Sequence, residues 1–195
     1  ELDIFGQRVH DLRLNAEQQP ESWLLDVELA WLKGRVTLPS DISRVGIVID
    51  SLNLAGLDTD LAQGLDQIDP GELSLPPIDV AIAALGSGEQ VWGDLSFKFA
   101  QLAKSYRFED IRGNLRGLQM GETEGMTLEW FHSQQPPETR LDGELVIGDL
   151  GDVLADFSYD RVIETSGGSF ALNLDWPGSP LEFELAAAVG GIEID

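Results

Sequence analysis

The sequence lacks cysteine altogether and is poor in basic residues and histidine. Its 195 residues include two His and 12 Lys or Arg against 35 Asp or Glu, so the formal net charge is −23. Without cysteine the chain can form no disulfide, no cysteine-ligated zinc site and no thiol nucleophile. The negative charge would repel the phosphates of DNA and RNA, so no nucleic-acid partner is expected, and it also argues against polybasic binding to anionic lipid.

Long apolar runs are missing as well. The longest, residues 80–85 and 185–189, fall well short of the roughly 20 residues that a membrane-spanning helix needs. The chain starts with Glu rather than Met, and its last residues alternate as a strand does. We therefore expect a fragment of a longer protein.

Catalytic motifs are absent from the sequence. His10 and His132 lie in turn-like stretches with no second metal ligand at a usual spacing, and we interpret both as solvated loop residues. The acidic pairs Asp58–Asp60 and Asp149–Asp152 could bind Ca²⁺, but neither has the 12-residue EF-hand loop. We expect a protein that is not an enzyme, with no catalytic residue, no metal site and no cofactor.

Alternation of apolar and polar residues dominates what is present. Because successive side chains on a strand point to opposite faces, each alternating run predicts a strand with one apolar face and one polar face. Pro and Gly between the runs are typical of turns. The predicted apolar positions are Trp23, Leu25, Val27, Leu29, Val45, Ile47, Ile49, Ile78, Val80, Ile82, Leu95, Phe97, Phe99, Met126, Leu128, Trp130, Leu145, Ile147, Phe170, Leu172, Leu174, Leu181, Phe183 and Leu185.

Two stretches have helical rather than strand spacing. Apolar residues at i, i+3, i+4 and i+7 predict a short helix over about 149–157, with Asp149 as its N-cap. Similar spacing from Leu61 to Ile68 predicts a second helix. The fold expected is therefore mainly β, with one or two short helices.

A weak internal repeat runs through the chain at an offset of 83 residues. It places Leu14, Trp23 and Leu25 on Phe97, Tyr106 and Phe108. Such self-similarity favours duplicated units within one continuous segment, over about 1–75 and 76–195.

The apolar faces allow more than one architecture. They could meet in a closed β-sandwich that binds glycans or serves in adhesion, or belong to a β-solenoid enzyme acting on polysaccharide. Alternatively, they could stay open as a trough for acyl chains, because a large open apolar face needs a ligand or partner. Alternation alone does not separate these alternatives.

The C-terminal part carries a more specific signal. A Leu-Asp-Trp-Pro-Gly-Ser-Pro stretch at 174–180 follows the predicted helix. This order resembles the C-terminal region of YhdP-like members of the AsmA-like family of Gram-negative envelope proteins. The resemblance is strong over about 105–195 and looser over 1–104.

The resemblance implies both a fold and a function. It implies an elongated, twisted antiparallel sheet curled into an open groove, in a protein anchored in the inner membrane. Such a groove would carry phospholipids through the periplasm towards the outer membrane, with docking proteins as possible further partners. The predicted apolar positions would then line the groove, with phospholipids as the ligand.

Overall fold

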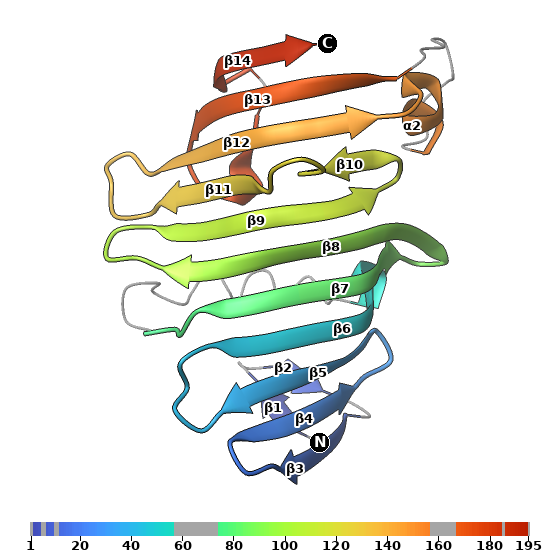
Figure 1. Cartoon of the computed structure of the whole chain (residues 1–195), viewed down its shortest axis with the longest axis vertical. Helices are drawn as coiled ribbons and strands as arrows, with labels where there is room; N and C mark the ends of the chain where they lie inside the picture. Colours follow the sequence, from blue (N-terminus) through green and yellow to red (C-terminus); the bar gives the residue numbers. More distant parts are fainter. Residues whose placement is uncertain are drawn as a thin grey trace. The chain divides into compact units, whose positions relative to one another are not determined.

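The computed structural model describes residues 2–4, 7–9, 12–56, 74–156, 167–184 and 186–194. These residues are mostly in strands (Figure 1). The chain divides into two units, Glu1–Asp94 and Leu95–Asp195. Most of the alternating runs therefore form strands as predicted.

The first unit is a sheet built from consecutive strands. Its elements are β1 (Leu2–Ile4), β2 (Gln7–Val9), β3 (Arg13–Gln18), β4 (Ser22–Glu28), β5 (Leu32–Pro39), β6 (Val45–Asn53), the 3-10 helix η1 (Leu54–Gly56) and β7 (Ile78–Ser87). Strands β1 and β2 pair only with each other, whereas β3 to β6 pair in chain order as antiparallel neighbours. Strand β8 (Gln90–Gln101) spans the division between the units.

One pair of strands runs parallel, which differs from the antiparallel sheet expected from the sequence. Strands β6 and β7 pair with Val45 opposite Ile78 and Ile49 opposite Ile82. A parallel pair needs a crossover of about a dozen residues or more, and the connection over 54–77 is long enough to supply it. The alternation predicts strands but carries no information on their direction.

In the second unit, the strand pairs between residues 106 and 194 are antiparallel. Its elements are β9 (Tyr106–Leu115), β10 (Leu118–Met120), β11 (Met126–Phe131), β12 (Glu138–Ile147), α2 (Leu150–Asp156), β13 (Gly168–Pro177), the 3-10 helix η2 (Pro180–Glu182) and β14 (Val189–Ile194). The short strands β10 and β11 both pair with β9 on one side and β12 on the other. Strands β13 and β14 continue the sheet beyond β12.

Helix α2 confirms the helix predicted near 149–157. The Asp149 carboxylate accepts hydrogen bonds from the backbone N–H groups of Gly151 at 2.7 Å and Asp152 at 3.2 Å, as an N-cap does. Val153 is buried. The second predicted helix, from Leu61 to Ile68, lies outside the described residues.

The fold class predicted from the sequence, mainly β with an open and twisted sheet, is confirmed. Twelve strands form one sheet of mixed direction, in the order β14–β13–β12–β10–β9–β8–β7–β6–β5–β4–β3, with β11 beside β12 and β9. Strands β14 and β3 end this order, so the sheet does not close into a barrel.

Few side chains are fully buried. The buried apolar residues in the described part of the chain are Val45, Ile82, Leu85, Tyr106, Met126, Ile147, Val153, Leu174 and Trp176. Gly143 makes room for one of them, because a Cβ at this position would clash with the side chain of Met126. Most other apolar side chains of the sheet are only half-buried.

Candidate functional site: the apolar face of the sheet

In the first unit, strand register gathers the apolar side chains on one face. Residues that are directly opposite on neighbouring strands share a face. Leu25 of β4 lies opposite Val36 of β5, and Val36 lies opposite Ile47 of β6. Ile47 in turn lies opposite Val80 of β7, so the row continues across four strands. The predicted residues on this face are Trp23, Leu25, Val27, Val45, Ile47, Ile49, Ile78, Val80 and Ile82.

This face remains partly open. Leu14 on β3 is 59% exposed and Trp23 on β4 is 41% exposed, while Val45 and Ile82 are buried. Leu29, another predicted lining residue, lies in the turn between β4 and β5, where its N–H donates to the carbonyl oxygen of Leu32. The face therefore offers accessible apolar surface at β3 and β4 in particular.

The second unit has an apolar face of the same kind, but richer in aromatic residues. Leu128 of β11 lies opposite Phe108 of β9 and Leu141 of β12, and Leu141 lies opposite Leu174 of β13. Trp130 likewise lies opposite Tyr106. The predicted residues that these strands place on this face are Met126, Leu128, Trp130, Leu145, Ile147, Phe170, Leu172 and Leu174.

The aromatic side chains of this second face pack against one another. Phe97 of β8 contacts Phe108 edge-on with ring centroids 5.6 Å apart, and Phe99 lies 5.5 Å from Tyr106. The predicted residue Leu95, also on β8, is half-buried. His132 stacks on Tyr106 at 4.8 Å. This contact differs from the solvated histidine that we expected, whereas His10 lies outside the described residues.

The end of β13 folds differently from the prediction. Alternation suggested a strand through Leu181, Phe183 and Leu185, but residues 180–182 form the 3-10 helix η2. Pro180 has no N–H to donate to a strand pair, and the Glu182 carboxylate accepts the N–H of Ser179 at 2.6 Å, which lowers the pKa of Glu182. Leu185 lies outside the described residues.

This turn covers part of the apolar face. Phe183 packs edge-on against Trp176 with ring centroids 5.0 Å apart, and the indole N–H of Trp176 donates to the carbonyl oxygen of Ser179 at 3.1 Å. The hydroxyl of Thr139, which is fully buried opposite Trp176, donates to the carbonyl oxygen of Gly178 at 2.8 Å. The turn therefore supplies a hydrogen-bond acceptor to the buried hydroxyl that Thr139 places on the apolar face.

Several further residues of the apolar face were not predicted. They are Leu14, Val36, Leu38, Tyr106, Phe108, Leu118, Met120, Leu141 and Ile192. Alternation at Val36 and Leu38, and the repeat partners of Phe108 and Tyr106, could have indicated some of them. Met120 and Leu118 lie in a strand too short to show a period.

The opposite face of each unit carries ion pairs. In the first unit the Arg35 guanidinium lies 2.6 Å from the Asp26 carboxylate, and this hydrogen bond lowers the pKa of Asp26. In the second unit Arg140 lies 2.7 Å from Asp175. Paired cross-strand residues place these groups on the face away from the apolar rows. Each unit therefore separates an apolar face from a charged face.

No catalytic or metal centre emerges from the described part of the chain. It contains no group of three or more His, Asp or Glu that could hold a metal ion. Of the suggested Ca²⁺ ligands, Asp149 caps α2, and Asp58 and Asp60 lie outside the described residues. Nor does this part include a helix with the length and apolar character to cross a membrane.

The fold and the two faces define a class of protein: an open β-sheet with one apolar and one ion-paired face. The chain belongs to the YhdP protein family, whose match covers residues 1–195. This confirms the resemblance found in the sequence and relates the chain to lipid transport. No curated protein and no solved structure matches the chain.

Proposed function

We propose that this chain is a segment of a lipid-transfer bridge and not an enzyme. In this proposal the sheet curls into a groove in the periplasm, and phospholipid acyl chains move along its apolar face between the inner and outer membranes. The longer protein would be anchored in the inner membrane and would dock on partner proteins.

The continuous apolar face is the observation that carries this proposal. Rows of Leu, Val and Ile repeat from β4 to β7 with nearly equivalent neighbours. Burying one acyl CH₂ group contributes about 0.8 kcal/mol. An acyl chain that moves from one row to the next keeps apolar contact throughout, so binding can be favourable without a deep trap.

The charged face supports the same reading. Its ion pairs and the net charge of −23 favour contact with water and oppose self-association. A closed β-sandwich, the alternative considered above, would need a second large sheet, and outside the 12-stranded sheet the only strands among the described residues are those of the short β1–β2 pair.

Two neighbouring leucines of β4 provide a test with a matched control. Leu25 lies opposite Ala16 and Val36 on the apolar face, whereas Leu24 lies opposite Glu17 and Thr37 on the charged face. We expect Leu25→Asp to reduce binding of a phospholipid with a fluorescent acyl chain by at least about tenfold, and Leu24→Asp to leave it nearly unchanged. Equal binding by both variants, with both still folded by circular dichroism, would refute the proposal.

Photo-crosslinking tests the second unit in the same way. A photoreactive residue at Phe97 or Leu172 should capture lipid, and one at Ser96 or Asn173 should not, because neighbouring residues of a strand point to opposite faces. Capture from both faces at equal yield would contradict a one-sided lipid path.

A further inference from the structure

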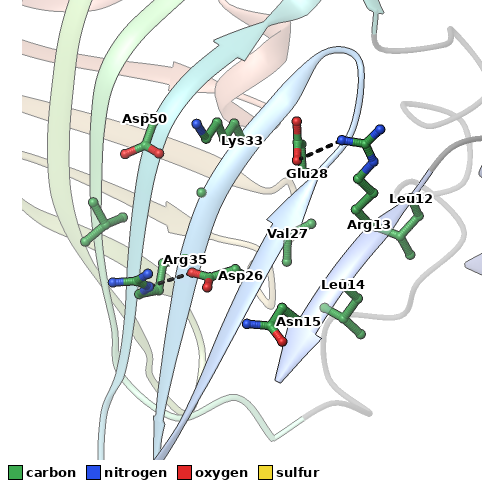
Figure 2. A pocket seen from close by; sticks show the side chains of 12 residues that line it. Leu12, Arg13, Leu14, Asn15, Asp26, Val27, Glu28, Lys33, Arg35 and Asp50 are labelled. Carbon is green, nitrogen blue, oxygen red and sulfur yellow. Dashed lines mark hydrogen bonds and ion pairs between the residues drawn. The ribbon is translucent and has the colours of Figure 1, made fainter. Parts of the chain in front are cut away.

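The two faces of the sheet differ in the polar contacts that they offer to a lipid. On the charged face of the first unit, a depression of about 890 Å³ is lined mainly by residues of β3 to β6, among them Arg13, Glu28, Lys33 and Asp50 (Figure 2). This depression lies on the other side of the sheet from the apolar rows. A lipid whose acyl chains lie on the apolar face cannot place its headgroup there, so its polar contacts must come from the apolar face itself.

Two nitrogen atoms on the apolar face of the second unit have no hydrogen-bond partner among the described residues. They are Nε1 of Trp130, on β11, and Nε2 of His132, in the turn after β11, and both atoms are buried. A buried polar group without a partner costs free energy, and such groups are few in native proteins. Two of them, two residues apart, indicate that a ligand supplies the missing partner.

Three aromatic rings surround these nitrogens. Tyr106 lies opposite Trp130 with ring centroids 5.8 Å apart, and His132 stacks on Tyr106 at 4.8 Å and meets Trp130 edge-on at 5.8 Å. We call these three residues the aromatic cluster. Trp130 and His132 are both partly exposed. Rotation about their side-chain torsions, with no change of the backbone, would therefore turn the two nitrogens towards a ligand.

The hydrogen-bonding character of the two nitrogens follows from their chemistry. The indole Nε1 of Trp130 is always a donor. Nδ1 of His132 lies 3.2 Å from the hydroxyl oxygen of Ser133. When this hydroxyl donates to Nδ1, the proton of the neutral ring is on Nε2, which is then a donor as well. In this tautomer the aromatic cluster has two N–H donors, which match acceptor oxygens of a ligand.

The aromatic cluster lies between an apolar row and a polar turn. Two residues before Trp130, Leu128 belongs to the apolar row with Phe108 and Leu141. Beyond the cluster, residues 133–137 are exposed and have the sequence Ser-Gln-Gln-Pro-Pro. From Leu128 outwards, this end of the sheet therefore offers apolar side chains, then N–H donors and then solvent. A phospholipid has its parts in the same order, namely acyl chains, ester carbonyl oxygens and headgroup.

We propose that the aromatic cluster binds the ester carbonyl oxygens of a phospholipid whose acyl chains lie on the apolar rows of the second unit. The indole N–H of Trp130 donates to one carbonyl oxygen, Nε2–H of His132 donates to the other, and the headgroup extends past the turn into water. A free fatty acid has a similar acceptor, but its carboxylate would meet the negative field of a chain with a net charge of −23. This inference rests on the proposed lipid-transfer function.

The test compares two phosphatidylcholines of equal chain length, one with ester-linked and one with ether-linked chains, each kept below its critical micelle concentration. The ether lipid lacks the carbonyl oxygens, so we expect the chain to bind the ester lipid about fivefold more tightly in isothermal titration calorimetry. The variant Trp130→Phe/His132→Phe keeps aromatic rings at both positions and removes both N–H groups. It should bind the two lipids with equal affinity.

Trp176→Phe is the matched control for this variant. Trp176 lies in the same row of the sheet, opposite Thr139, but its indole N–H already donates to the carbonyl oxygen of Ser179 at 3.1 Å. Trp176→Phe should therefore lower the melting temperature and keep the preference for the ester lipid. Loss of the preference in this control as well would overturn the specific role of Trp130 and His132.

A spectroscopic measurement on the unaltered chain tests the hydrogen bond directly. Each of the five Trp residues gives one indole N–H signal in a ¹⁵N–¹H spectrum. The signal of Trp130, assigned by its absence in Trp130→Phe, should move downfield with the ester lipid and not with the ether lipid. The signal of Trp176 should stay in place with both. Equal shifts of the Trp130 signal with both lipids would contradict a bond to the carbonyl oxygen.

The remaining outcomes separate this site from the wider proposal. Equal affinity of the unaltered chain for both lipids would overturn the ester site and leave lipid binding intact, whereas binding of neither lipid would refute the proposed function itself. The fatty acid of the same chain length should bind more weakly than the ester lipid. Tighter binding of the fatty acid would identify a carboxylate as the ligand and overturn the assignment to a phospholipid ester.

Discussion

The hairpins β3–β4 and β8–β9 are separated by 83 residues and share the same turn. The N–H of Gln19 donates to the carbonyl oxygen of Ser22 at 2.8 Å, and the N–H of Leu102 donates to that of Ser105 at 2.9 Å. The offset found in the sequence therefore corresponds to equivalent backbone hydrogen bonds. The two hairpins nevertheless differ in how far their apolar side chains are exposed to solvent.

Trp23 and Tyr106 occupy the same position in the two hairpins. Trp23 is 41% exposed, whereas Tyr106 is 7% exposed. The difference comes from the neighbours of Tyr106, since Phe99, Trp130 and His132 all lie within ring contact of it. One backbone unit can thus present its apolar face or cover it, depending on the side chains of adjacent strands.

On the charged faces too, the ion pair of the β3–β4 hairpin is more exposed and less closely held than that of the β8–β9 hairpin. Arg13 and Glu28 lie 3.7 Å apart and are mostly exposed. Arg107 donates two hydrogen bonds to one Glu129 oxygen, at 3.0 and 2.9 Å, and the hydroxyl of Ser105 donates to the other at 2.5 Å. The β8–β9 hairpin therefore contributes mainly to stability, and the β3–β4 hairpin keeps both its faces accessible to a ligand.

The largest expected effect is on the free energy of unfolding when the two equivalent aromatics are truncated. Tyr106→Ala should destabilise the chain by about 3 kcal/mol, because it leaves a cavity among packed rings. Trp23→Ala should cost about 1 kcal/mol, since much of its side chain is already in water. Urea unfolding monitored by circular dichroism measures both, and equal losses would show that the exposure difference has no energetic meaning.

An intermediate effect is expected at the two acidic residues. Glu129→Ala should cost about 2 kcal/mol, because it removes two hydrogen bonds of Arg107 and leaves the buried Ser105 hydroxyl without its acceptor. Glu28→Ala should change the free energy of unfolding by less than about 0.5 kcal/mol, as is usual for exposed ion pairs. The same unfolding experiment applies, and a larger loss for Glu28→Ala than for Glu129→Ala would reverse the comparison.

The sequence predicted which residues share a face of the sheet better than it predicted strand direction and the turns between strands. Period-two alternation depends only on strand geometry, so Leu25, Ile47 and Leu172 could be placed without knowledge of their neighbours. The parallel direction of β6 and β7 could not be predicted, because alternation is the same in both directions. The strand predicted through Leu181 and Phe183 was wrong because a local carboxylate–backbone hydrogen bond stabilises a 3-10 turn there.

Of the candidate site, the apolar positions could be predicted from the sequence, but the grouping of charged residues could not. Apolar positions repeat, whereas a charged depression arises from cross-strand partners far apart in sequence. Lys33 and Asp50 are not neighbours in any sequence pattern, and they line one depression only because β4, β5 and β6 pair in a particular register. His132 was misinterpreted for the same reason, since its contact with Tyr106 depends on the pairing of β9 and β11.

The smallest expected effect concerns the protonation of the charged face. The hydrogen bond from Arg35 lowers the pKa of Asp26 below its ordinary value of 3.8. A carboxylate with a lowered pKa contributes stability above its unfolded-state pKa, and this contribution is lost as the pH falls through the folded-state pKa. Arg35→Gln should therefore raise the pKa of Asp26 towards 3.8 in an NMR titration and remove this small acid dependence. Asp110 should keep its lowered pKa in this variant, because its partners are Arg112 and Lys98; a parallel rise at Asp110 would mean that the two charged faces do not titrate independently.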